Sequence, residues 1–214
     1  MIELVIFDCD GVLVDSEPLA AKVSQAVLAD LGWQLGIDEI VERFVGAAAG
    51  SFERQIEEQL GRPLNPGWNE KYSSWYRDEF ERELKPIAGI ESVLAALQLP
   101  FCVASNSSHD RVRQMLTRVG LLDYFDGAIF SAEDVEHGKP APDLFLHAAA
   151  VLGVDSSRCL VVEDSRFGVA AARAAGMAVL GYAGGLTPAE WLEGPDTTVF
   201  ESMSELPELI ARRS

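Results

Sequence analysis

Two aspartates stand two residues apart near the start of the chain, directly after a short apolar run. Asp8 and Asp10 follow the apolar residues 4–7. A carboxylate can attack phosphorus as a nucleophile and form an acyl phosphate. A second carboxyl group is then needed to protonate the leaving oxygen and later to activate water. The pair therefore points to phosphoryl transfer, in which Asp10 can take the acid and base role.

Later apolar runs of the same kind, at residues 101–104, 128–130 and 159–162, are also followed by polar residues. The residues concerned are Ser105 with Asn106, Lys139 in a longer loop, and Glu163 with Asp164. Ligands of open α/β sheets bind beyond the carboxyl ends of the strands. We therefore expect four strand ends to bring these groups to one rim of a sheet.

The carboxylates of this set predict a metal site. Carboxylates that cluster raise each other's pKa unless a cation holds them. Asp8, Glu163 and Asp164, with a backbone carbonyl near Asp10, are hard oxygen donors of the kind that suits Mg²⁺. The sequence therefore predicts Mg²⁺ as the cofactor.

The remaining polar groups predict a phosphate site. Lys139 and the metal would neutralise a phosphate dianion, and Ser105 Oγ, nearby N–H groups and the loop at Gly11 would donate hydrogen bonds to its oxygens. Asn106 stands next to Ser105 and is included among the phosphate-binding candidates. Phosphoryl transfer depends above all on such positioning and charge neutralisation.

These segments resemble the four motifs of the haloacid dehalogenase superfamily. The matching segments are residues 7–17, Ser105-Asn106, residues 139–143, and residues 162–165 with Gly168. The chain is most similar to the subfamily with a helical cap inserted after the first strand, which includes β-phosphoglucomutase and many sugar-phosphate phosphatases. The order and spacing agree over essentially the whole chain.

The resemblance implies a role for each of these residues. Asp8 would be the nucleophile and a Mg²⁺ ligand, and Asp10 would be the general acid and base and bind Mg²⁺ through its carbonyl. Ser105 and Lys139 would hold the phosphate. Asp164 would complete the metal site, with Glu163 binding the metal directly or through water.

Short apolar runs alternate with helical patterns, which predicts right-handed βαβ units and an α/β, doubly wound parallel sheet. We expect a Rossmann-like core of residues 1–15 and 87–214. Four amphipathic patterns in residues 16–86 predict an inserted all-helical cap domain with its own aromatic core. By the resemblance this cap would be a lid, and Val45, Gly46 and Ala49 in one of its loops would choose the substrate.

Departures from the family's patterns separate the alternatives. Dehalogenases lack the second aspartate, which is present here as Asp10. Phosphonoacetaldehyde hydrolases need a cap lysine, and residues 45–51 contain none. β-Phosphoglucomutases carry a histidine where Ala20 stands here, and cations in the cap loop, which residues 45–49 lack. Hydrolysis to free phosphate is therefore favoured, with a mutase as the main alternative. A non-catalytic binding module would show a damaged first motif, whereas this motif is intact.

Composition sets further limits. The net charge of −17 argues against nucleic acids and anionic membranes as partners. No apolar run approaches the ~20 residues that a membrane span requires, and we do not expect the first residues to form a signal peptide. Three isolated cysteines are typical of a reducing cytoplasm. We therefore expect a cytoplasmic phosphatase, a monomer or weak homo-oligomer, acting on a small phosphorylated metabolite such as a sugar or sugar-acid phosphate.

Overall fold

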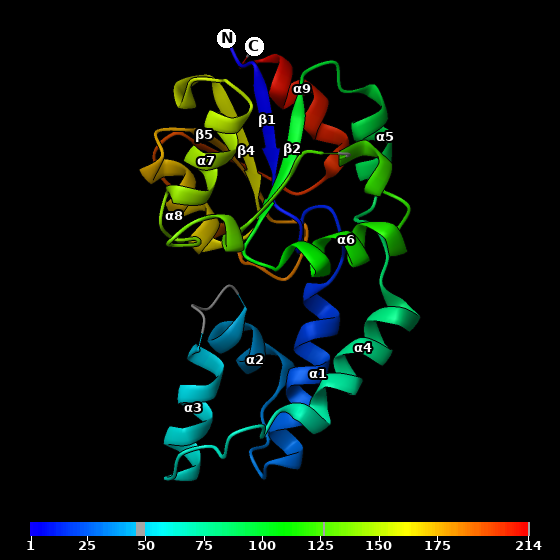
Figure 1. The fold of residues 1–214 in the computed structure, drawn as a ribbon, viewed down its shortest axis with the longest axis vertical. Coiled ribbons are helices and arrows are strands. Elements are labelled where there is room, and N and C mark those ends of the chain that lie inside the picture. The colour runs from blue at the N-terminus through cyan, green and yellow to red at the C-terminus, as the bar shows by residue number, and fades with distance from the viewer. Residues whose placement is uncertain (46–49, 126, 214) are drawn as a thin grey trace. The chain divides into compact units, whose positions relative to one another are not determined.

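The structure is a computed structural model that describes residues 1–45, 50–125 and 127–213 of the 214-residue chain (Figure 1). The chain divides into two compact units. One consists of Met1–Asp15 with Lys85–Ser214, and the other of Ser16–Leu84. The insert expected from the sequence, residues 16–86, therefore differs from the compact second unit by two residues at one end.

The larger unit contains a parallel sheet, which has six strands in the described part of the chain. The strands are β1 (Leu4–Phe7), β2 (Phe101–Ser105), β3 (Ile129–Ser131), β4 (Cys159–Glu163), β5 (Ala178–Tyr182) and β6 (Thr197–Phe200). They lie in the order β3-β2-β1-β4-β5-β6, and every neighbouring pair is parallel. This is a doubly wound, Rossmann-like order, so the predicted fold class is confirmed.

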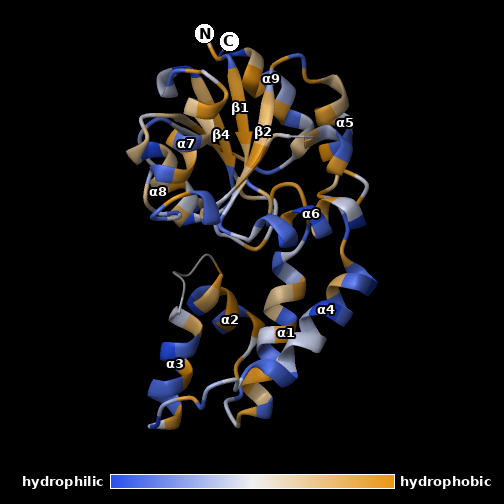
Figure 2. Cartoon of the chain, in the orientation of Figure 1, coloured by the Kyte–Doolittle hydropathy of each residue, from blue (hydrophilic) through white to orange (hydrophobic). Residues whose placement is uncertain are grey.

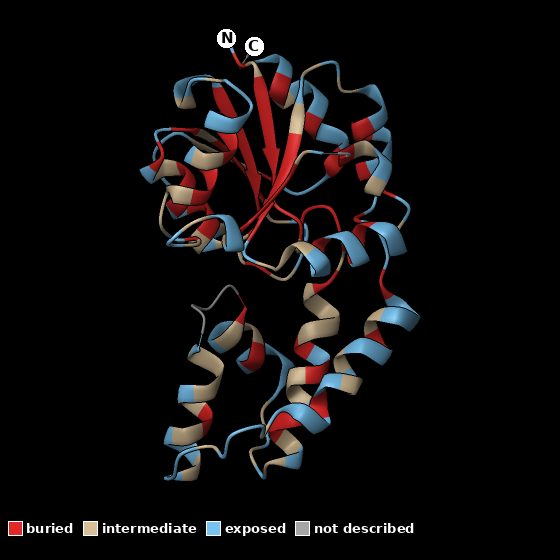
Figure 3. Cartoon of the chain, viewed as in Figure 1, coloured by how far each residue is buried: buried red, intermediate tan, exposed pale blue. Residues whose placement is uncertain are grey.

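Helices lie between the strands of this unit, and one more follows the last strand. Their bounds are α5 (Ile90–Ala96), α6 (His109–Arg118), α7 (Asp143–Val151), α8 (Arg166–Ala174) and α9 (Leu206–Ala211). The central strands are apolar along their length and buried on both faces (Figures 2 and 3). Phe145 of α7 and Val169 of α8 belong to the same buried cluster as Ile6 of β1 and Val161 of β4. The core thus fixes the central strands and the loops that leave them.

The strand order reverses between β1 and β4. From β1 the chain passes to β2 and β3 on one side, and it then crosses to β4 on the other side of β1. Val5, Ile6 and Phe7 pair with strands on both sides. Such a switch point leaves a crevice at the carboxyl ends of the strands, where ligands of these sheets bind. The candidate residues that follow β1 and β4 therefore flank this crevice.

The smaller unit is helical. It contains α1 (Glu17–Asp30), α2 (Ile37–Phe44), α3 (Ser51–Leu60) and α4 (Glu70–Glu83). Val23, Val27 and Tyr72 form its buried cluster, and further aromatic side chains pack against them. Glu17 and Pro18 form the first turn of α1. Proline is favoured there because the first N–H groups of a helix need no partner within it.

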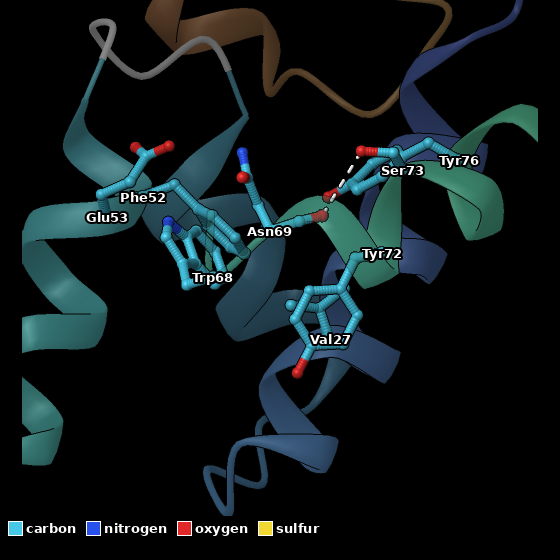
Figure 4. A pocket seen from close by; sticks show the side chains of 8 residues that line it. All are labelled: Val27, Phe52, Glu53, Trp68, Asn69, Tyr72, Ser73 and Tyr76. Atoms are coloured by element: carbon cyan, nitrogen blue, oxygen red, sulfur yellow. Dashed lines mark hydrogen bonds between the residues drawn. The ribbon is translucent and has the colours of Figure 1, made fainter. Parts of the chain in front are cut away.

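A pocket of about 160 Å³ lies within the helical unit (Figure 4). Phe52, Trp68, Tyr72 and Tyr76 contribute to its walls. The rings of Trp68 and Tyr72 pack edge to face with their centroids 5.9 Å apart. The pocket is thus a gap in an aromatic core. Its charged lining residue is Glu53, and a carboxylate would repel a phosphate group.

Within residues 1–45, 50–125 and 127–213, no helix is both long and apolar enough to span a bilayer.

Candidate active site

Lys139 joins two carboxylates that belong to different strand ends. Its Nζ lies 2.5 Å from Asp8 Oδ1 and 2.8 Å from Glu163 Oε1. The lysine side chain is 3% exposed, and Nζ also lies 4.8 Å from the centre of the Phe145 ring. Burial by itself would lower the pKa of Lys139, but the two carboxylates outweigh it and raise that pKa. Lys139 is therefore a fixed positive charge inside the unit.

Asp8 is the first residue after β1. It is 7% exposed, and its N–H donates to the carbonyl of Val162 in β4 at 2.9 Å. Burial raises the pKa of the Asp8 carboxyl group to about 8, with Glu163 and Asp10 acting in the same direction and Lys139 opposing them. Burial thus favours the neutral form of Asp8, and an added cation would favour its ionised form.

Cys9 lies between the two aspartates but has a structural role. It is fully buried, and its carbonyl accepts hydrogen bonds from the N–H groups of Leu13 and Val14 at 3.0 and 3.1 Å. Burial raises the pKa of the Cys9 thiol well above its ordinary value. The thiol is thus unsuited to act as a nucleophile, and the carboxylates carry the chemistry of this loop.

Gly11 allows the loop after β1 to approach Asp164. Its φ is +76°, and a Cβ atom at this position would lie 1.9 Å from Asp164 Oδ2. Asp164 is 4% exposed and directly follows β4. The missing side chain of Gly11 therefore brings the Asp164 carboxylate against the loop that carries Asp8 and Asp10. This contact explains why glycine is required at position 11, independently of the phosphate binding that the sequence predicts for it.

Ser105 ends β2 and is 2% exposed. Its Oγ accepts a hydrogen bond from the N–H of Ser107 at 3.1 Å, so its own O–H can still donate to a ligand. This arrangement is compatible with the phosphate-binding role that the sequence predicts.

Asn106 is used differently. Its side chain donates to the carbonyl of Lys139 at 3.0 Å and accepts from the N–H of Lys139 at 2.9 Å. Gly138 leaves room for it, because a Cβ there would lie 2.7 Å from Asn106 Oδ1. The sequence grouped Asn106 with the phosphate ligands. Its amide holds the main chain of Lys139 in place, and its contact with phosphate stays a prediction.

Glu163 is also strongly engaged. Besides Lys139, its carboxylate accepts hydrogen bonds from the N–H and the hydroxyl of Ser165, at 2.7 and 2.9 Å. Ser165 is the N-cap of α8 and accepts from the N–H of Gly168 at 3.0 Å. Both oxygens of Glu163, which is 1% exposed, thus have donors within the protein.

The donor set at these strand ends fits the magnesium ion that the sequence predicts. In the described part of the chain, no group of three or more His, Cys, Asp or Glu side chains is arranged to hold a metal. The metal role predicted for Glu163, which faces Lys139 and Ser165, stays a prediction beside the carboxylates of Asp8 and Asp164 and the backbone carbonyl of Asp10. These are hard oxygen donors, and water completes the coordination of Mg²⁺ in most protein sites.

Charge supports the same fit. Asp8, Glu163 and Asp164 are buried carboxylates. The buried cation beside them is Lys139, which lies between β3 and α7. Buried charge of one sign is costly unless it is balanced. A divalent cation at Asp8 and Asp164 would offset the excess negative charge.

The residues predicted to choose the substrate belong to the helical unit. Val45 directly follows α2 and is 6% exposed. Gly46 and Ala49 lie outside the described residues.

Sequence reasoning missed one contact of the candidate site. The hydroxyl of Ser107 donates to Asp10 Oδ2 at 3.1 Å, although 97 positions separate the two residues. The only signal in the sequence was that Ser107 follows Ser105 after the same strand.

Comparisons with known proteins point to one family of hydrolases. Residues 2–176 match the family model of haloacid dehalogenase-like hydrolases. The chain is 32% identical to 6-phosphogluconate phosphatase of Escherichia coli K12 over 212 residues, which cover 97% of this chain and 94% of the relative.

Two solved structures resemble the whole chain. A haloacid dehalogenase-like protein of Agrobacterium tumefaciens is 42% identical, with a TM-score of 0.90 and coverage of 100% and 99% of the two chains. A hydrolase of the same family from Deinococcus radiodurans, solved with bound phosphate and sodium, is 32% identical, with a TM-score of 0.83 and coverage of 99% and 96%.

Proposed function

Since the chain belongs to the haloacid dehalogenase-like hydrolases and is a phosphoric monoester hydrolase, we propose that it works through a covalent phosphate on Asp8, with Mg²⁺ as cofactor. The observation that carries this proposal is the position of Lys139. Its ammonium joins the Asp8 carboxylate to Glu163 at the carboxyl ends of β1 and β4. A buried cation beside a buried carboxylate is suited to hold a phosphate dianion next to its nucleophile.

In the first step an Asp8 oxygen attacks phosphorus, and the bond from phosphorus to the leaving oxygen breaks. Asp10 gives its proton to that oxygen, so that the alcohol leaves neutral. Lys139 and the hydroxyl of Ser105 bind the oxygens of the phosphate and keep it in line with Asp8. Asp8 now carries the phosphate as an acyl phosphate.

In the second step Asp10 takes a proton from water, and the water oxygen attacks the same phosphorus. The bond from phosphorus to Asp8 breaks, inorganic phosphate leaves, and both aspartates return to their starting states. The residues that would hold Mg²⁺ are Asp8, Asp164 and the carbonyl of Asp10. When bound, the ion supplies positive charge that offsets the charge of the phosphate and of the carboxylates.

The substrate class proposed is a small phosphorylated metabolite, specifically a sugar phosphate or a sugar-acid phosphate. The similarity to 6-phosphogluconate phosphatase over nearly the whole chain supports this class. The substrate-selecting role of Val45, Gly46 and Ala49 stays a prediction.

The proposal is tested by release of inorganic phosphate from p-nitrophenyl phosphate and from a panel of phosphorylated sugars and sugar acids, with Mg²⁺ and with EDTA. We expect turnover with Mg²⁺ and no turnover with EDTA. At least one sugar or sugar-acid phosphate should be preferred over p-nitrophenyl phosphate. Rapid acid quenching followed by mass spectrometry should find a phosphate adduct on the peptide that contains Asp8. An adduct on another residue would contradict the proposed nucleophile.

A further inference from the structure

Ser107 lies in the loop after β2 and touches the carboxylate of Asp10, which lies in the loop after β1. Its hydroxyl donates to Asp10 Oδ2 at 3.1 Å. β1 and β2 are neighbours in the sheet, with Phe7 paired to Val103. Parallel strands that are neighbours end at the same edge, so their loops meet there. The contact is therefore a consequence of the sheet order.

The main chain of Ser107 is held from both sides by buried hydroxyl groups. Its N–H donates to Ser105 Oγ at 3.1 Å, and its carbonyl accepts from Ser131 Oγ at 2.8 Å. Ser105 is 2% exposed and Ser131 is fully buried. Ser131 Oγ in turn accepts from the N–H of Glu133 at 3.1 Å. The backbone that carries the Ser107 hydroxyl is thus fixed to the ends of two strands.

A local turn explains only part of this arrangement. The bond from the N–H of Ser107 to Ser105 Oγ spans two residues and is the ordinary serine turn that shapes many loops. The bond to Asp10 spans 97 residues and does not contribute to the shape of that turn. Ser107 therefore does something besides closing its own loop.

The chemistry of a hydroxyl suits a partner that changes its protonation state. A general acid and base alternates between a carboxylic acid and a carboxylate during one catalytic cycle. A serine hydroxyl can donate to the carboxylate and can accept from the acid, because it is both a donor and an acceptor. Ser107 can therefore keep the Asp10 side chain in one orientation through both steps.

We propose that Ser107 is the positioning residue of Asp10 and holds its carboxyl group toward the leaving oxygen and the attacking water. The proposal rests on the function proposed above, because it assigns Ser107 to the acid and base step of that reaction. It adds a residue from the loop after β2 to the proton-transfer machinery.

The test compares leaving groups in the Ser107→Ala variant, using kcat/KM, which covers all steps up to departure of the leaving group. p-Nitrophenolate leaves without a proton, whereas the alkoxide of glycerol 2-phosphate needs one. Proton transfer contributes roughly 10²–10⁴-fold, so partial misplacement of Asp10 should lower kcat/KM for glycerol 2-phosphate about 10–100-fold and for p-nitrophenyl phosphate less than about 3-fold. Ser107→Thr keeps the hydroxyl and should restore the ratio of the two values.

Ser108→Ala is the matched control. Ser108 is the next residue, and it caps α6 by accepting from the N–H of Arg111 at 3.3 Å. Its loss should lower the midpoint of thermal unfolding while leaving the ratio between the two substrates at the wild-type value. Ser107→Cys, with a weak donor, serves as the second variant if Ser107→Ala is unstable, and its ratio should lie between those of wild type and Ser107→Ala.

Three results would overturn the inference. Equal losses on the two substrates would mean that Ser107 only supports the loop, and wild-type values in Ser107→Ala would mean that Asp10 needs no such partner. A wild-type enzyme that releases no phosphate from any monoester with Mg²⁺ would overturn the proposed function and this inference together. The first two results leave the proposed function standing, so the two failures can be told apart.

Discussion

The Cα atom of Gly168 faces the carboxylate of Glu163 so closely that a Cβ atom there would lie 1.7 Å from Glu163 Oε1. Gly168 is in the first turn of α8, and Glu163 is the last residue of β4. The absence of a side chain at Gly168 thus lets Glu163 reach Lys139 and Ser165 at once. Gly168, which belongs to the fourth motif, therefore influences the buried Lys139 through the position of the Glu163 carboxylate.

Gly168→Ala should destabilise the protein, although alanine is generally more favourable than glycine in a helix interior, by about 1 kcal/mol. Glu163 would have to move and lose its bonds to Lys139 and Ser165, and overpacking of this kind costs about 1–3 kcal/mol. We expect a lower midpoint of thermal unfolding and a kcat/KM reduced for all substrates alike. Gly185→Ala is the control, because a Cβ there meets nothing within 4 Å. A more stable and fully active Gly168→Ala would contradict the account of Glu163.

Asp8→Asn should abolish turnover and keep the fold. The amide is nearly isosteric and can still accept a hydrogen bond from Lys139, but it cannot attack phosphorus. Phosphate release would be measured together with the circular dichroism spectrum, with the exposed Asp123→Asn as a control for the loss of one charge. Turnover within tenfold of wild type would remove Asp8 as the nucleophile.

Asp10→Asn should lose proton transfer while its backbone carbonyl remains in place. Because this step contributes roughly 10²–10⁴-fold, kcat/KM should fall by that order for an alkyl phosphate and by much less for p-nitrophenyl phosphate. Steady-state kinetics on the two substrates provide the measurement. The same loss on both would argue against the acid role of Asp10.

Much of the candidate site follows from the order of apolar runs and polar residues. Asp8, Ser105 and Asp164 were predicted to meet because parallel strands of one sheet end at the same edge, and the fold class is as expected. The contacts of each side chain could not be predicted from that order. The role of Asn106 depends on where the loop of Lys139 passes, and residue types alone do not determine that path.

The strands that sequence reasoning missed or misplaced have weak apolar signals. β6 (Thr197–Phe200) lies at the edge of the sheet, and of its residues only Phe200 is buried, so it lacks a continuous apolar run. The third strand was expected at residues 128–130, but it includes Ser131, a polar residue that a hydropathy pattern excludes. Ser131 is fully buried because its hydroxyl is satisfied by the carbonyl of Ser107.

Asn106→Ala should weaken the binding of phosphate. The N–H of Lys139 would lose its acceptor, which costs about 1–3 kcal/mol when the group stays buried, and the loop could shift the ammonium. We expect the inhibition constant of inorganic phosphate to rise about tenfold, which corresponds to about 1.4 kcal/mol. Ser108→Ala, two positions along, is the control. An unchanged inhibition constant would mean that Lys139 keeps its position without Asn106.

Magnesium should stabilise the folded protein. Two variants should show which carboxylates bind the ion and which only lie beside it. An ion that binds only the native state stabilises it by about 2.7 kcal/mol at a concentration of 100 times the dissociation constant. We therefore expect Mg²⁺ to raise the midpoint of thermal unfolding, measured against NaCl of equal ionic strength so that simple screening is subtracted.

Asp164→Asn should remove most of this increase, because it replaces a proposed ligand that lies against the loop at Gly11. Glu163→Gln should keep the increase, because the Glu163 carboxylate is occupied by Lys139 and by the N–H and hydroxyl of Ser165. The glutamine variant should instead bind inorganic phosphate more tightly, because it removes a buried negative charge 2.8 Å from Lys139 Nζ. If Glu163→Gln lost the magnesium effect as completely as Asp164→Asn does, Glu163 would be a metal ligand, and its engagement with Lys139 would be a feature of the metal-free state alone.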